Sequence, residues 1–136
     1  MRCGLVAAAV VFATLGQAGD ASAKLNCKEP MSTADMLQCA DQDFQRADKE
    51  LNAIYAKIMT QLKETYTAED IKNAGGQDPV ADLKDAQRKW IAFRDANCRF
   101  MGTQMLGGSG QAPITAGCMA RMTEDRVKEF KNYLGE

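Results

Sequence analysis

Cysteine is the most reactive side chain that this sequence offers, and the chain contains five of them. Cys3 lies in an N-terminal segment that we expect to be removed, which leaves Cys27, Cys39, Cys98 and Cys118. An even set of cysteines in a short exported protein is typical of two disulfides, and not of metal ligands or a nucleophile. Four cysteines allow three pairings, and the sequence alone does not select one. Closure of the shorter loops favours Cys27–Cys39 and Cys98–Cys118.

The N-terminal segment has the three parts of a secretory signal peptide. Arg2 gives a positive start, residues 5–15 form an unbroken apolar run, and Ala21-Ser22-Ala23 matches the small-x-small cleavage pattern. The apolar run is much shorter than the roughly 20 residues that a membrane-spanning helix needs. Cys27 follows no small-apolar stretch, so we expect no lipid anchor. The sequence predicts a signal peptide over residues 1–23 and a soluble, periplasmic or secreted domain over residues 24–136, without membrane insertion.

Other residues give little indication of catalysis. The chain has no histidine, which is the usual proton shuttle near neutral pH. Ser109 lies among glycines, with no histidine that could activate it as a nucleophile. We therefore expect no enzymatic activity and no cofactor.

Four methionines lie on either side of the glycine-rich segment, at Met101, Met105, Met119 and Met122. Thioether sulfur can bind copper(I), but methionines at helical spacing more commonly fill a core. We predict no metal site, and a methionine-based metal-binding protein remains the third hypothesis.

The charge balance excludes some partners. The chain has 17 Lys and Arg against 18 Asp and Glu, a net charge of -1. Nucleic-acid binding calls for a basic face, and attraction to anionic lipid calls for a basic cluster. We therefore expect a protein partner and no nucleic acid.

Three segments show helical periodicity and must position these residues. The first follows Ser32 and carries apolar residues at steps of three and four from Met36 to Leu62. A short helical turn begins after Thr67. The second long helix begins at Asp78-Pro79, with Val80, Leu83, Gln87, Trp90, Ile91, Arg94 and Cys98 on its inner face. The third follows Pro113, with Met119, Met122, Arg126, Val127, Phe130 and Leu134 inside.

These elements predict an all-α fold. The expected architecture is a small antiparallel three-helix bundle, with a short helical turn between helices one and two and two disulfides. Cys39, Cys98 and Cys118 then lie at one end. Aligning Cys39 with Cys98 places Arg94 near Asp43, and Asp48 near Arg88 or Lys89. We interpret the polar and aromatic residues as an inter-helix network of Asp48, Arg88, Trp90, Arg94, Asp95 and Arg126.

The glycine-rich segment between helices two and three is the candidate binding site. Its residues are Gly107, Gly108, Ser109, Gly110, Gln111 and Pro113. The segment is uncharged, and the Cys98–Cys118 pairing would hold both of its ends. A constrained loop of small residues can enter a cleft of a partner at little cost in ordering entropy. A plain connector is the alternative interpretation.

Longer motifs point to a family. Met36-x-x-Cys39 and Ala47-Asp48-x-x-Leu51-Asn52-x-x-Tyr55 form the first half of its pattern. Ala86-Gln87-Arg88-x-Trp90-x-x-Phe93-Arg94-Asp95-x-x-Cys98 forms the second, and Gly107-Gly108-Ser109, Cys118 and Thr123-x-x-Arg126 complete it. The mature chain thus resembles the LprI-type lysozyme-inhibitor domain of secreted bacterial proteins. The resemblance implies a helical, disulfide-bonded extracytoplasmic domain, and for the family's namesake it implies inhibition of lysozyme. The namesake is a lipoprotein, whereas this chain shows no lipidation cysteine.

Our first hypothesis is therefore an exported, non-enzymatic protein-binding domain that inhibits c-type lysozyme. The second is a structural or accessory protein of the cell envelope that binds another protein.

Overall fold

Each long amphipathic segment of the sequence forms a helix. The computed structural model describes residues 25–136, and the predicted signal peptide lies outside them. The helices are α1 (Thr33–Thr65), α2 (Ala68–Asn73), α3 (Pro79–Gly102) and α4 (Gln111–Leu134), and a 3-10 turn, η1 (Thr103–Met105), follows α3. Residues 25–136 contain no strand. The predicted all-α fold is confirmed.

Local capping decides where the helices begin. The Ser32 hydroxyl accepts a hydrogen bond from the Asp35 amide at 3.0 Å, which satisfies a donor that has no partner within the helix. Thr67 and Asp70 form a reciprocal capping box before α2. The Asp78 carboxylate accepts from the amides of Val80 and Ala81, with Pro79 at the first helical position. These three helix starts lie where the sequence predicted them.

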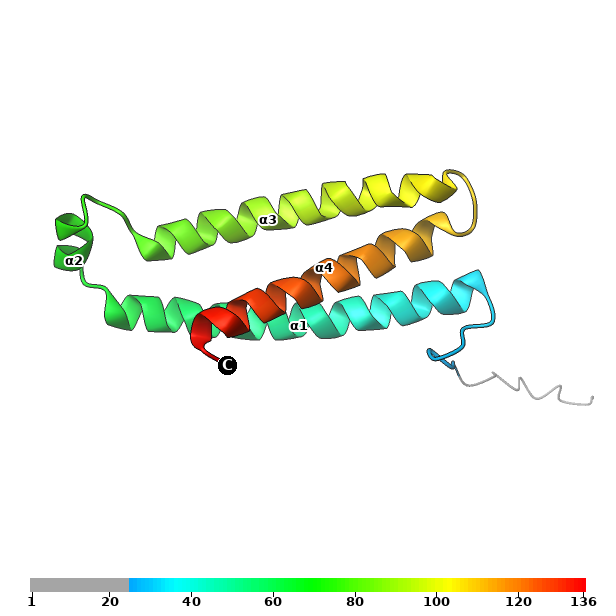
Figure 1. The fold of residues 1–136 in the computed structure, drawn as a ribbon, viewed down its shortest axis with the longest axis horizontal. Helices are drawn as coiled ribbons and strands as arrows, with labels where there is room; N and C mark the ends of the chain where they lie inside the picture. Colours follow the sequence, from blue (N-terminus) through cyan, green and yellow to red (C-terminus); the bar gives the residue numbers. More distant parts are fainter. Residues whose placement is uncertain (1–24) are drawn as a thin grey trace, which may run out of the picture.

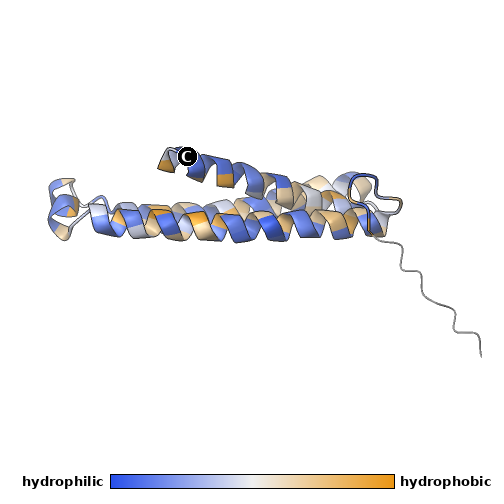
Figure 2. Ribbon diagram, turned by 90° about the horizontal axis from the view of Figure 1, so that it is seen from below, coloured by the Kyte–Doolittle hydropathy of each residue, from blue (hydrophilic) through white to orange (hydrophobic). Residues whose placement is uncertain are grey.

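The three long helices form an antiparallel bundle. α1 and α4 run in the same direction, and α3 runs opposite to both (Figure 1). α4 lies on one side of α1 and α3 and contacts both of them, whereas α1 and α3 contact each other little. Hydrophobic and hydrophilic residues alternate along α1 (Figure 2), as expected of a helix with one buried face.

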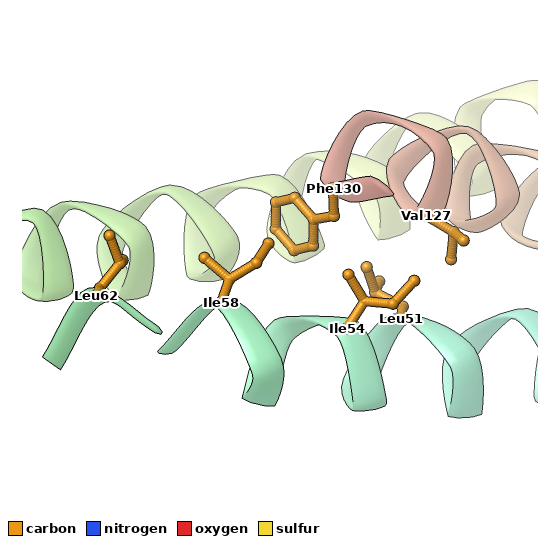
Figure 3. Close-up of a cluster of buried hydrophobic side chains, with 6 residues drawn as sticks. All are labelled: Leu51, Ile54, Ile58, Leu62, Val127 and Phe130. Carbon is orange, nitrogen blue, oxygen red and sulfur yellow. The ribbon is translucent and has the colours of Figure 1, made fainter. Parts of the chain in front are cut away.

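The main hydrophobic core lies between α1 and α4 (Figure 3). Its buried members are Leu51, Ile54, Ile58, Leu62, Val127 and Phe130. Leu51 and Ile58 are each 2 % exposed. Burying such a side chain completely contributes about 1.5–3 kcal/mol, so this cluster holds α4 onto the middle of α1.

Two residues predicted on inner faces lie outside the core. Ile91 is 39 % exposed, because the buried face of α3 is centred on Gln87, Arg94 and Cys98, and Ile91 lies at its edge. Met36 is also exposed, one turn before Cys39, the first buried residue of α1.

Candidate functional site at the disulfide-linked end

Both disulfides lie at the same end of the bundle. Cys27 is bonded to Cys39 near the start of α1, and Cys98 is bonded to Cys118, which joins the end of α3 to the first half of α4. The Cα–Cα distances are 5.5 and 5.4 Å. These are the two local pairings that the sequence favoured. We call residues 25–44 and 98–119 the disulfide-linked end.

The connection between η1 and α4 is an ordered turn. The amide of Gly108 donates to the carbonyl oxygen of Met105 at 2.8 Å. The amide of Gly107 donates to the side-chain oxygen of Gln111 at 2.9 Å. Gly107 has φ +75°, a conformation that residues with a side chain rarely adopt. The glycine-rich segment is therefore held in one conformation by its own hydrogen bonds.

Two of the six predicted loop residues belong to a helix. α4 begins at Gln111, so Gln111 and Pro113 lie in its first turn, and the prediction that the helix starts after Pro113 was wrong. A proline fits there because the amides of the first helical turn have no acceptor within the helix. Gly107, Gly108, Ser109 and Gly110 form the turn before it.

An open groove of about 750 Å³ lies between α1, the glycine-rich turn and α4. Leu37 and Phe44 line it from α1, and Ala116 and Met119 line it from α4. Gly107, Gly108, Ser109 and Gln111 of the predicted binding set also line it, together with Asp41, Ala112 and Thr115. Its wall is mainly apolar, and the carboxylate of Asp41 gives it a negative charge.

Exposed apolar side chains gather at this end. Five of the large hydrophobic residues that the solvent reaches belong to it or to its edge: Met31, Met36, Phe100, Met105 and Leu106. Leu106 is 76 % exposed and Phe100 is 70 % exposed. Residues 101–120 contain no Asp, Glu, Lys or Arg. The turn and the start of α4 therefore combine an uncharged sequence with exposed apolar side chains, which makes this end a candidate interaction site.

A stack of cations and aromatic rings runs from this end into the bundle. The Arg94 guanidinium lies 5.1 Å from the ring centroid of Phe44 and 5.2 Å from that of Trp90. Arg126 lies 5.7 Å from the Trp90 centroid and 4.4 Å from that of Phe130. The stack therefore links α1, α3 and α4 in the order Phe44, Arg94, Trp90, Arg126 and Phe130. Because Phe44 also lines the groove, this stack fixes one wall of the candidate site.

Arg94 is the most buried charge of this stack, with 7 % of its side chain exposed. It pairs with Asp95 at 2.9 Å and with Asp48 at 3.8 Å, and it donates to the Thr123 hydroxyl at 3.3 Å. The two carboxylates and the hydroxyl thus give the N–H groups of the Arg94 guanidinium polar partners, as a buried charge requires.

The predicted pairing of Arg94 with Asp43 was wrong. Arg94 pairs with Asp48, whereas Asp43 pairs with Arg46 on its own helix at 2.7 Å, which raises the pKa of Arg46. Arg88 does not join the network, because its side chain is 78 % exposed and pairs with Asp85 on the outer side of α3. The other five predicted network residues lie near one another, since Arg126 donates to Gln87 beside Trp90.

Sequence reasoning missed several residues of this end. Asp41 belongs to the polar face of α1, and Phe100 lies off the inner-face spacing of α3. Leu106 lies outside every helix. The charge-free run over residues 101–120 was the signal that could have marked this surface.

Within residues 25–136, no three His, Cys, Asp or Glu side chains lie together in a way that could hold a metal ion. No helix in the same range combines the length and the apolarity that a membrane crossing requires.

Comparison with known proteins identifies the family. The family model described as lysozyme inhibitor LprI matches residues 26–130, which include both disulfides, the glycine-rich turn and the cation–aromatic stack. The chain belongs to the LprI family. The resemblance found in the sequence motifs is confirmed.

A relative of this LprI-family chain occurs in Rhizobium meliloti (strain 1021), where it is described as an uncharacterized protein. The two are 31 % identical over 134 residues, which cover 98 % of this chain and 96 % of the relative. No solved structure matches the chain significantly.

Proposed function

We propose that this LprI-family protein is an exported, non-enzymatic inhibitor of c-type lysozyme that binds through its disulfide-linked end. The observation that carries the proposal is the family match over residues 26–130, a range that contains both disulfides and every residue that lines the groove. The expected signal peptide supports export to the periplasm or beyond, where such an enzyme would be met.

The chemistry of the disulfide-linked end suits a protein partner. Leu106 and Phe100 are exposed to solvent, and the groove, which Gly107 next to Leu106 lines, offers the apolar side chains of Leu37 and Phe44. A partner could bury the exposed apolar side chains in its own surface and insert apolar side chains of its own into the groove. Burial of apolar surface is the usual driving force of association.

The rigidity of this end favours tight binding. The turn at residues 106–110 has its own hydrogen bonds, and the Cys98–Cys118 disulfide ties the helices on either side of it. A surface that is already ordered loses less conformational entropy when it binds. We infer that the turn presents Leu106 to the lysozyme in the conformation seen here.

The test is a lysis assay with purified protein that carries both disulfides. Lysozyme of the c type is mixed with the protein, and its lysis of bacterial cells is followed by turbidity. We expect lysis to slow in proportion to the protein added and to stop near equimolar ratio. Unchanged lysis at micromolar excess would contradict the proposal. A partner recovered from the periplasm in that case would support an accessory protein of the envelope instead.

A further inference from the structure

Among the described residues that line the groove at the disulfide-linked end, Asp41 is the only charged one. It is exposed, and none of the ion pairs formed within residues 25–136 includes it. Two other polar side chains of the groove have partners inside the molecule. Gln111 accepts from the amide of Gly107 at 2.9 Å, and the Thr115 hydroxyl donates to the Gln111 carbonyl oxygen at 3.0 Å. The Asp41 carboxylate therefore remains available to a binding partner.

A partner that covers the groove removes water from the Asp41 carboxylate. A buried charge without a counter-charge is costly, whereas a carboxylate that is paired and hydrogen-bonded to a cation is tolerated. The other residues that line the groove carry no charge. The partner must therefore bring the positive charge itself.

Phe44 decides which cation fits this position best. It lies three positions after Asp41 on α1, so the two side chains are neighbours on the helix surface, and both line the groove. A guanidinium can form two parallel hydrogen bonds with a carboxylate and also stack on an aromatic ring, whereas an ammonium is a compact, strongly hydrated charge. The Phe44 ring already has one such neighbour inside the molecule, because the Arg94 guanidinium lies 5.1 Å from its centroid.

The charge of Arg94 does not exclude a second cation from the groove. Arg94 pairs with Asp95 at 2.9 Å and with Asp48 at 3.8 Å, so its charge is balanced inside the bundle. Its side chain is 7 % exposed, and it is not one of the residues that line the groove. The groove therefore keeps the negative charge of Asp41.

We propose that the groove binds an arginine side chain of the partner, with the guanidinium on the Asp41 carboxylate and beside the Phe44 ring. The apolar side chains of Leu37 and Met119, which also line the groove, suit the methylene stem of that arginine. This inference rests on the proposed function for its partner, because it names the group of lysozyme that the disulfide-linked end receives.

The first measurement replaces lysozyme with a small probe. N-acetyl-arginine amide is titrated into the folded protein with both disulfides intact, and the signals of Asp41 and Phe44 are followed by NMR. We expect saturable shifts at both residues. Binding should be about tenfold weaker for the citrulline analogue, which has the shape without the charge, and about threefold weaker for the lysine analogue. Absence of shifts with the arginine probe, or equal binding of either analogue, would overturn the proposal.

The second measurement compares inhibition constants for c-type lysozyme. Asp41→Asn keeps the size of the side chain and removes its charge, and we expect inhibition to weaken about tenfold. The variant should fold like the wild type, because Asp41 makes no ion pair within residues 25–136. Glu29→Gln is the matched control: Glu29 is an exposed carboxylate of the same end that does not line the groove, and its variant should inhibit like the wild type.

Unchanged inhibition in Asp41→Asn would contradict the arginine site. An equal loss in Asp41→Asn and Glu29→Gln would also contradict it, because the loss would then reflect the overall charge of this end. Failure of the proposed function gives a different result, namely a wild-type protein that does not slow lysis. The probe titration tests the groove in that case as well, because it does not involve lysozyme.

Discussion

The guanidinium of Arg94 lies 5.2 Å from the ring centroid of Trp90, one helical turn away on α3. The same guanidinium lies 5.1 Å from the Phe44 ring on α1 and bonds to Thr123 on α4. One side chain therefore contacts all three long helices. Since α1 and α3 otherwise contact each other little, Arg94 is a principal link between them.

Removal of Arg94 should destabilise the fold strongly. An Arg94→Ala variant leaves Asp48 and Asp95 without their shared cation and opens space beside Trp90. We expect a loss of about 2–4 kcal/mol in the free energy of unfolding, measured by urea denaturation with both disulfides intact. Arg88→Ala is the matched control, because Arg88 is exposed and pairs within its own helix. Its change should stay within about 0.5 kcal/mol, and equal losses in both variants would contradict this role of Arg94.

Two glycines should respond in opposite directions to substitution by alanine. A Cβ on Gly102 would overlap the Thr115 hydroxyl and lie 3.3 Å from the Gln111 carbonyl oxygen, where α3 meets the start of α4. We expect Gly102→Ala to cost about 1–3 kcal/mol. A Cβ on Gly117 would meet nothing within 4 Å, and this residue lies inside α4. Gly117→Ala should stabilise the protein by about 0.5–1 kcal/mol, because alanine favours the helix. Thermal unfolding of the two variants distinguishes these outcomes, and a stabilised Gly102→Ala would show that the helices do not meet closely there.

The two disulfides should differ in their rates of reduction. Cys98 is 0 % exposed and Cys118 is 3 % exposed, whereas Cys27 lies on the surface. An external thiol or phosphine should therefore reduce Cys27–Cys39 first in the folded protein. Timed alkylation followed by peptide mapping measures the two rates. In urea both bonds become accessible, and the rates should converge. Faster reduction of Cys98–Cys118 in the folded state would contradict the observed burial.

The capping box before α2 should show a defined pH dependence. Hydrogen bonds from the Thr67 hydroxyl and the Thr67 amide lower the pKa of the Asp70 carboxyl. A lowered pKa means that the cap stabilises the folded state above the unfolded pKa, and that this contribution is lost as the pH falls through the folded pKa. A Thr67→Ala variant should raise the Asp70 pKa toward its usual value, as measured by an NMR titration. Thr60→Ala, at an exposed position of α1, should leave it unchanged; a pKa of Asp70 that is the same in all three proteins would show that the cap does not form in solution.

The helix starts were predictable from the sequence because capping is local. The side chains of Ser32, Thr67 and Asp78 each accept a hydrogen bond from an amide two or three residues further along the chain. The identities of neighbouring residues are therefore enough to predict these helix starts. The short loops likewise favoured the two cysteine pairs, and the family motifs marked the segment from Trp90 to Arg94.

The ion-pair partner of Arg94 was not predictable, because it depends on how closely the helices approach. α4 presents Ala116, Ala120 and Thr123 among its buried residues, and Thr123 is 0 % exposed. A search for large apolar residues at helical spacing passes over these small side chains. Thr123 accepts a hydrogen bond from Arg94, and Asp48 takes the place of Asp43 as the ion-pair partner of Arg94 on α1.

The candidate site was predictable in its location and not in its composition. Cysteine spacing placed the glycine-rich segment at one end of the bundle, as the structure has it. Exposure is a property of the whole fold, so neither Leu106 nor Phe100 could be identified from local spacing.

The claim that the disulfide-linked end inhibits lysozyme is tested most directly by one comparison of inhibition constants. Leu106→Asp places a charge on an exposed side chain of the turn, and Tyr66→Asp does the same at the opposite end of α1, where Tyr66 is 43 % exposed. In the lysis assay with c-type lysozyme, we expect Leu106→Asp to weaken inhibition about tenfold or more and Tyr66→Asp to match the wild type. Inhibition that is unchanged in Leu106→Asp, or lost in Tyr66→Asp with the fold intact, would contradict the account.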